Sequence, residues 1–212
     1  MDIILFDLDG TLTDPGLGIT NSVMYALRKY GMEVPPRQEL YSFIGPPLKQ
    51  SFMRWCGFDE AEGEQAVKYY REYYRDKGLL ENEVYDGIED MLRALREKGK
   101  RLAVATSKPE EFAIRILEHF GLAQYFEVIA GDTLDFKRNT KADVIASALE
   151  RLGVTDRSGV IMVGDREHDV IGAKAQDLPC IGVLFGYGSQ EELEAAGAKH
   201  IAQTPADVLK YV

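Results

Sequence analysis

Short apolar runs alternate with longer amphipathic stretches along most of the chain. The apolar runs are rich in Val, Ile and Leu, which is typical of strands buried on both faces of a parallel sheet. We predict such strands at residues 2–6, 101–105, 126–130, 159–163 and 179–184.

Between these strands, apolar positions recur every three or four residues, which predicts amphipathic helices. Strands that alternate with helices form βαβ units, so we expect an α/β fold with a doubly wound, Rossmann-like parallel sheet. The predicted helices of this sheet cover residues 87–98, 110–120, 141–152 and 167–175.

One segment interrupts the alternation, because no strand-like run occurs between residue 13 and about residue 83. We therefore expect an all-helical insertion at residues 14–83, within an α/β domain built from residues 1–13 and 84–212. The insertion follows the first strand directly, so it can cover the end of that strand like a lid. Helical spacing within it occurs at residues 19–30, 37–42, 47–56 and 59–76.

The composition is that of an ordinary globular protein, with 45% hydrophobic and 28% charged residues. A net charge of −10 argues against a nucleic-acid polymer or an anionic membrane as a partner, because both favour basic patches. The sequence has no signal-peptide pattern and no apolar run of about 18 residues, so we expect a cytoplasmic protein. Cys56 and Cys180 lie far apart without a CxxC motif, which argues against a disulfide framework or a zinc site. The composition leaves open whether the chain is a monomer or a homodimer.

Asp7 and Asp9 bracket Leu8 at the carboxyl end of the first predicted strand, where open α/β sheets bind their ligands. Two carboxylates this close repel each other unless a cation lies between them or one is protonated. A hard divalent ion such as Mg²⁺ prefers such oxygen ligands. Gly10 follows and lets the backbone approach an anion closely. An Asx turn that closes the strand is the simpler alternative for this stretch.

Hydroxyl groups and a lysine follow the next two predicted strands. Thr106 and Ser107 lie just before a predicted helix, where hydroxyls and free amides can bind an anion. Lys141 begins another helix, and a cation there can neutralise a phosphate and an aspartate together. Helix capping alone is the alternative for the Thr-Ser pair, and we interpret Lys137 and Arg138 as solvated loop charges.

Asp165 and Asp169 follow the fourth predicted strand. Their spacing on a helical turn places both carboxylates on one side. A helix N-cap explains one aspartate, but not two beside a site already rich in carboxylates. Because all these polar clusters follow the carboxyl ends of successive strands, we expect them to meet in one site.

Together these residues resemble the motifs of the haloacid dehalogenase superfamily over nearly the whole chain. The helical insertion resembles the type-one cap of that superfamily. The matching motifs are DLDGT at 7–11, Thr106 with Ser107, Lys141, and GDREHD at 164–169.

Within the superfamily, the chain is most similar to the branch of phosphoglycolate phosphatases and bacterial 5′-nucleotidases. One departure weakens the phosphoglycolate assignment: Lys141 is followed by Ala142, where that group often has proline. The stretches that carry the similarity are FIGPPL at 43–48, VATSKP at 104–109 and MVGDREHD at 162–169.

The resemblance implies a Mg²⁺-dependent phosphatase that hydrolyses a small phosphate monoester through an aspartyl phosphate. Asp7 is then the nucleophile, and Asp9 protonates the leaving group and later deprotonates the attacking water. The metal is held by the Asp7 carboxylate, the Asp9 main-chain carbonyl and Asp165, with Asp169 next to these ligands.

The resemblance also implies the residues that bind the substrate. In the insertion, Lys49 and Arg54 are expected to contact the leaving group. A nucleotide or phosphoglycolate is the best guess for the ester. The residues expected to bind the phosphoryl group are Gly10, Thr106, Ser107 and Lys141, of which Thr106 and Lys141 act in catalysis.

Several other functions share parts of this pattern. A dehalogenase needs neither Asp9 nor a metal, and a phosphonatase needs a Schiff-base lysine, for which Lys49 is a formal candidate. A phosphomutase of the β-phosphoglucomutase type shares the core and stays an alternative. A receiver-like signalling domain is the non-enzymatic alternative, but receivers place the phosphorylated aspartate after their third strand and are about half this length.

Overall fold

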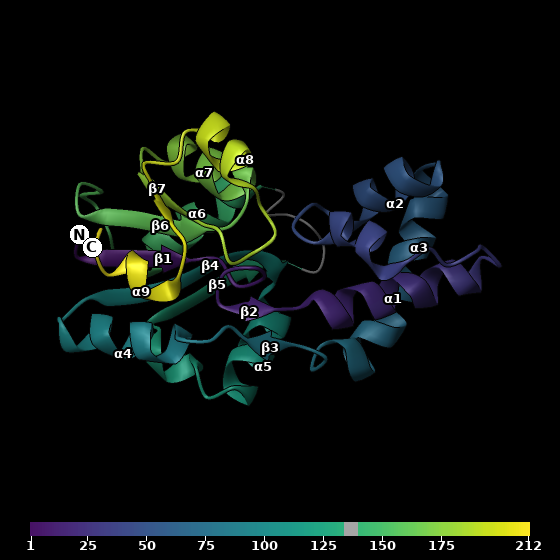
Figure 1. The fold of residues 1–212 in the computed structure, drawn as a ribbon, viewed down its shortest axis with the longest axis horizontal. Helices are drawn as coiled ribbons and strands as arrows, with labels where there is room; N and C mark the ends of the chain where they lie inside the picture. The colour runs from purple at the N-terminus through teal and green to yellow at the C-terminus, as the bar shows by residue number, and fades with distance from the viewer. Residues whose placement is uncertain (134–139) are drawn as a thin grey trace. The chain divides into compact units, whose positions relative to one another are not determined.

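The computed structural model describes residues 1–133 and 140–212. The chain divides into two compact units, one formed by Met1–Thr13 with Val84–Val212 and the other by Asp14–Glu83. We call them the core unit and the helical unit. Their connections lie at β2 (Thr13–Asp14) and β3 (Glu83–Val84), which form a two-stranded sheet (Figure 1).

The core unit is built on a six-stranded sheet of the order β5-β4-β1-β6-β7-β8. Each neighbouring pair is parallel, and β1 is central: Ile3 pairs with Arg101 of β4 and with Val160 of β6. This confirms the predicted doubly wound α/β fold. The strands are β1 (Ile3–Phe6), β4 (Arg101–Pro109), β5 (Val128–Asp132), β6 (Val160–Gly164), β7 (Cys180–Val183) and β8 (His200–Ala202).

Helices cover both faces of this sheet, with α6 and α7 on one side and α4 and α5 on the other (Figure 1). Ile3 and Leu5 of β1 belong to the hydrophobic cluster that contains the buried side chains of α6, α7 and α8. Strand alternation turns Ile4 and Phe6 to the opposite face, so β1 must be apolar throughout. The helices are α4 (Ile88–Glu97), α5 (Glu110–His119), α6 (Lys141–Arg151), α7 (Glu167–Ala175), α8 (Gln190–Ala196) and α9 (Pro205–Val208).

Two strands differ from the prediction by more than one residue at an end. The strand expected at 101–105 continues to Pro109, so the polar residues after Ala105 belong to β4 itself. The strand expected at 126–130 is Val128–Asp132, because a 3₁₀ turn, η3 (Ala123–Tyr125), holds the preceding residues through backbone hydrogen bonds.

The helical unit contains helices only between its two connecting strands. A capping box at Asp59 begins α3, which packs against α1 and α2. Two predicted helices differ in type from an α-helix. The helix predicted at 37–42 is a 3₁₀ helix, and the helix predicted at 59–76 is α3 followed by a π-helical turn. The elements are α1 (Gly16–Lys29), η1 (Arg37–Phe43), α2 (Leu48–Cys56), α3 (Glu60–Tyr73) and η2 (Tyr74–Gly78).

Among the residues described, no helix combines the length and the apolar character needed to cross a membrane.

Candidate active site

Three aspartates meet beyond the carboxyl ends of β1 and β6. Asp7 follows β1, Asp165 follows β6, and Asp169 lies in the first turn of α7. Each offers a carboxylate oxygen, and these atoms lie within 4.8 Å of one another. Asp165 and Asp169 are fully buried, and Asp7 is 9% exposed. The chain reverses its direction of winding at β1 and β6, which is where doubly wound sheets bind ligands.

Lys141 connects two of these aspartates. Its Nζ atom lies 2.8 Å from Oδ1 of Asp7 and 2.7 Å from Oδ1 of Asp169, and it donates a hydrogen bond to the Ala105 carbonyl. The lysine is the first residue of α6, whose start is fixed by a capping box at Thr140. Burial alone would lower the pKa of Lys141, but the Asp169 and Asp7 carboxylates raise it, so the ammonium stays charged.

The aspartates of the cluster carry more negative charge than Lys141 neutralises. Burial raises the pKa of Asp169 to about 6, although Lys141 opposes this shift and Asp7 adds to it. Burial, with Asp169 and Asp7 nearby, also raises the pKa of Asp165 well above its ordinary value. When all three carboxylates are ionised, they and the one ammonium leave two negative charges, which a single divalent cation would neutralise. The oxygen ligands and the excess charge therefore fit Mg²⁺.

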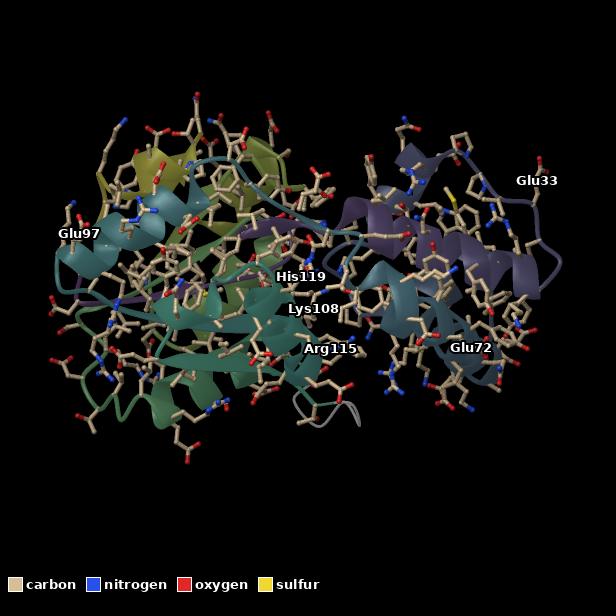
Figure 2. The ribbon with its side chains drawn as sticks, turned by 90° about the horizontal axis from the view of Figure 1, so that it is seen from below. Glu33, Glu72, Glu97, Lys108, Arg115 and His119 are labelled. Atoms are coloured by element: carbon tan, nitrogen blue, oxygen red, sulfur yellow. The ribbon has the colours of Figure 1, made fainter. Side chains whose placement is uncertain are left out.

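Asp9 has a partner that was not among the predicted site residues. The Nζ atom of Lys108 lies 2.8 Å from Oδ2 of Asp9. Burial raises the pKa of Asp9, and the Lys108 ammonium opposes this shift. Lys108 lies at the carboxyl end of β4, at the opposite end of the core unit from Glu97 (Figure 2).

Strand alternation could have identified Lys108. Alternate residues of a strand share a face, so Thr106 and Lys108 lie on one side of β4 and Ser107 on the other. Thr106 and Lys108 are buried, whereas Ser107 is exposed. The Thr106 hydroxyl also accepts a hydrogen bond from the Lys108 amide, at 3.2 Å.

Two glycines allow the backbone to pack tightly around Asp165. Gly10 has a φ of +81°, and a Cβ atom there would lie 2.2 Å from Oδ2 of Asp165. A Cβ atom on Gly186, in the loop after β7, would lie 2.1 Å from the Gly10 carbonyl oxygen. In the same loop, the Tyr187 amide donates a hydrogen bond to Oδ2 of Asp165, at 2.9 Å. This loop is not among the predicted site elements, although its closely spaced glycines after a strand are a signal in the sequence.

Two predicted site residues come from the insertion. Lys49 and Arg54 lie in the helical unit, where Lys49 forms ion pairs with Glu60 and Glu64 of α3. Arg54 is exposed on α2. Lys137 and Arg138 lie outside the described residues.

The match to a family model covers most of the chain. Residues 4–183 match the model described as haloacid dehalogenase-like hydrolase. The chain therefore belongs to the haloacid dehalogenase-like hydrolases, which confirms the resemblance and the prediction that the chain is an enzyme. This assignment also favours an enzyme over a receiver domain.

Individual relatives are similar over most of the chain. A protein of Pseudomonas aeruginosa named 5′-nucleotidase is 48% identical over 197 residues, which cover 93% of this chain and 89% of the relative. Tyrosine-protein kinase PtkA of Mycobacterium tuberculosis is 44% identical over 192 residues. These residues cover 91% of this chain and 65% of that relative. A crystal structure described as a predicted phosphatase from Clostridium acetobutylicum is 51% identical, with a TM-score of 0.95 over 99% of this chain and 97% of that chain.

Proposed function

We propose that the chain is a Mg²⁺-dependent phosphatase that hydrolyses a small phosphate monoester by transferring the phosphoryl group to Asp7. The observation that carries the proposal is the buried cluster of Asp7, Asp165 and Asp169 around Lys141, with its excess of negative charge. A packed core has no use for such a cluster, because uncompensated buried charge opposes folding.

The metal would be held by the carboxylates of Asp7 and Asp165 and by the main-chain carbonyl of Asp9. Asp169 would lie next to these ligands, because the Lys141 ammonium and the Arg166 amide already engage both of its carboxylate oxygens. Bound Mg²⁺ would supply positive charge that lets an anionic phosphate approach an anionic carboxylate.

Asp7 and Asp9 would divide the chemistry between them. In the first step, a carboxylate oxygen of Asp7 forms a bond to phosphorus while the bond from phosphorus to the ester oxygen breaks. Asp9 gives its proton to that leaving oxygen, and its raised pKa supports this role. In the second step, Asp9 takes a proton from water, the water oxygen bonds to phosphorus, and Asp7 is released.

The groups around the nucleophile would bind the other phosphoryl oxygens. The Lys141 ammonium, the Thr106 hydroxyl and the main-chain amides that follow Thr106 offer donors to them. Gly10 would allow the backbone to come close. In phosphoryl transfer, charge is spread over these equatorial oxygens, so fixed donors stabilise the transition state.

The proposed hydrolysis has an alternative, in which the phosphoryl group is transferred to an acceptor other than water. The relative named 5′-nucleotidase supports water as the acceptor and a nucleoside monophosphate as the first substrate to test. Phosphoglycolate is the second substrate, and a phosphomutase reaction and transfer to a protein tyrosine are the alternative outcomes. The helical unit supplies Lys49 and Arg54 as candidates for contacts to the leaving group.

The test is release of inorganic phosphate by the purified full chain from nucleoside monophosphates, phosphoglycolate, hexose phosphates and p-nitrophenyl phosphate. We expect release that requires Mg²⁺ and is stopped by EDTA. Replacing the nucleophile in Asp7→Asn should lower the rate by at least roughly 1,000-fold.

The matched control is Glu97→Gln, which removes an exposed carboxylate at the opposite end of the core unit from Lys108 (Figure 2). It should leave the rate unchanged. Activity that survives EDTA or the Asp7 substitution would contradict the proposal. Formation of a transferred phosphate ester in place of inorganic phosphate would show that the chain is a transferase instead.

A further inference from the structure

The helical unit contains a cavity of its own. Its volume is about 400 Å³, and its walls come from residues 14, 16 and 17, from η1 at residues 37 and 41, and from residues 80–83. None of the residues assigned above to the nucleophile, the metal or the phosphoryl group lines it. The volume is within the range of small-molecule sites, which begins at about 300 Å³.

Exposed apolar side chains gather around this cavity. Leu17, Tyr41 and Leu80 line it and are 51%, 39% and 48% exposed. Within the described chain, the other large apolar side chains with comparable exposure are Trp55 and Ile171, which do not line it. Apolar groups that remain exposed around one hollow are typical of a surface that a ligand covers.

A buried amide is left unpaired in the wall of the same cavity. Asn82 is only 8% exposed, and neither its side-chain nitrogen nor its side-chain oxygen has a hydrogen-bond partner. Native proteins pair almost all buried polar groups, so an amide of this kind calls for a partner from outside the chain. The partner must accept one hydrogen bond and donate another, side by side.

The charged groups of the wall indicate a ligand without negative charge. Arg37 already donates to the Leu17 carbonyl and the Asn21 side chain. Glu81 accepts hydrogen bonds from Asn21 and from Tyr73. The wall has more carboxylates than cations, since it includes Asp14, Glu81 and Glu83 beside Arg37, and this balance disfavours an anion.

We propose that this cavity binds a neutral, planar heterocycle that carries a hydrogen-bond donor next to an acceptor, as nucleobases do. The polar edge of the ring pairs with the Asn82 amide, and its faces lie against Leu17, Tyr41 and Leu80. This geometry matches the two-bond pairing of an asparagine amide with the amino group and neighbouring ring nitrogen of adenine. The proposal does not rest on the catalytic proposal, because it concerns binding to the helical unit.

The test is calorimetric titration of the full chain with adenosine and with purine riboside, which lacks the amino group of adenosine. We expect adenosine to bind the unsubstituted protein, and purine riboside to bind roughly tenfold more weakly or worse. Asn82→Leu should weaken adenosine binding by a similar factor and remove the difference between the two ligands.

Surface variants keep the test informative if Asn82→Leu does not fold. Leu80→Ser should weaken adenosine binding, whereas its matched control Ile171→Ser, at a site 52% exposed in the core unit, should not. Absence of adenosine binding, or equal affinity for both ligands in the unsubstituted protein, would overturn the proposal. Because the readout is binding, its failure is distinct from a failure of phosphate release.

Discussion

The Nζ atom of Lys108 lies 2.8 Å from Oδ2 of Asp9, in a pair whose side chains are 5% and 16% exposed. The ammonium lowers the pKa of Asp9, and burial raises it by more. In the proposed mechanism, Lys108 would thus set how readily Asp9 changes between the acid form that protonates the leaving group and the base form that activates water.

Replacing Lys108 by methionine is predicted to raise the pKa of Asp9 further, because the opposing positive charge is lost. The second step requires ionised Asp9, so the acidic limb of the kcat profile should move to higher pH. The measurement is kcat against pH for the unsubstituted protein, Lys108→Met and Lys108→Arg, in which arginine keeps the charge. An unchanged limb in Lys108→Met would show that the pair does not control Asp9.

The carboxylate cluster should make the metal-free protein less stable as pH rises. The pKa of Asp169 is about 6 in the folded protein and 3.8 ordinarily, so between these values the folded state binds more protons than the unfolded state. The contribution of Asp169 to the free energy of unfolding therefore falls as pH rises from about 4 to about 6 and stays low above that range.

Asp165→Asn is predicted to relieve this repulsion. Without metal, its free energy of unfolding should exceed that of the unsubstituted protein above pH 6 by on the order of 1 kcal/mol, and the gain should shrink toward pH 4. Mg²⁺ should stabilise the unsubstituted protein but not the variant. Urea unfolding across pH, with Glu97→Gln as the control, checks this, and equal Mg²⁺ stabilisation of both proteins would contradict it.

Lys141→Met should affect both stability and rate. Loss of the ammonium leaves Asp7 and Asp169 without their shared partner, and breaking a buried ion pair in this way costs about 3–5 kcal/mol. The loss of a donor to the phosphoryl group should lower kcat roughly 100- to 1,000-fold. Urea unfolding and phosphate release at saturating substrate measure the two effects, and Mg²⁺ should restore part of the stability but not the rate.

Gly186→Ala should disturb Asp165 without changing any charge. The added methyl group would lie 2.1 Å from the Gly10 carbonyl oxygen and 2.5 Å from Cβ of Asp165, so the backbone or the carboxylate must move. Displacement of a catalytic group by about 1 Å can lower the rate up to about 100-fold.

Gly159→Ala is the matched control for this substitution, because the nearest atom to its methyl group is a side-chain oxygen of Asp2, at 3.1 Å. Comparing kcat and Mg²⁺ affinity of the two alanine variants tests the prediction. Equal activity in both would mean that the Gly186 loop does not position Asp165.

Much of the fold could be predicted from the sequence because its strands are buried on both faces. β1 and β6 therefore appear as unbroken apolar runs, and the aspartates that follow them mark their ends. The predicted end of β4 at residue 105 was wrong because Thr106 and Lys108 are polar although they continue the strand. Polar residues in a strand have the same appearance in a sequence as the start of a loop.

The site could be predicted only in part for a related reason. Asp7 and Asp165 directly follow strands, and Lys141 and Asp169 lie in the first turns of the helices that come next, so their meeting follows from the sheet topology. The glycine at 186 acts through the absence of a side chain, and Asn82 is conspicuous only because the folded chain leaves it unpaired. The close spacing of glycines at 186 and 188 marks a loop in the sequence, but the contact of Gly186 with Asp165 and the unpaired Asn82 amide are visible only in the three-dimensional structure.

The most direct test of the central claim is detection of phosphate on Asp7. In Asp9→Asn, p-nitrophenyl phosphate should still transfer its phosphoryl group, because its leaving group needs no acid, whereas water attack is slow for lack of a base. We predict a burst of p-nitrophenolate equal to the enzyme concentration, and borohydride reduction with peptide mapping should then locate the modification at Asp7. No burst, or a modification at another residue, would show that Asp7 is not the nucleophile.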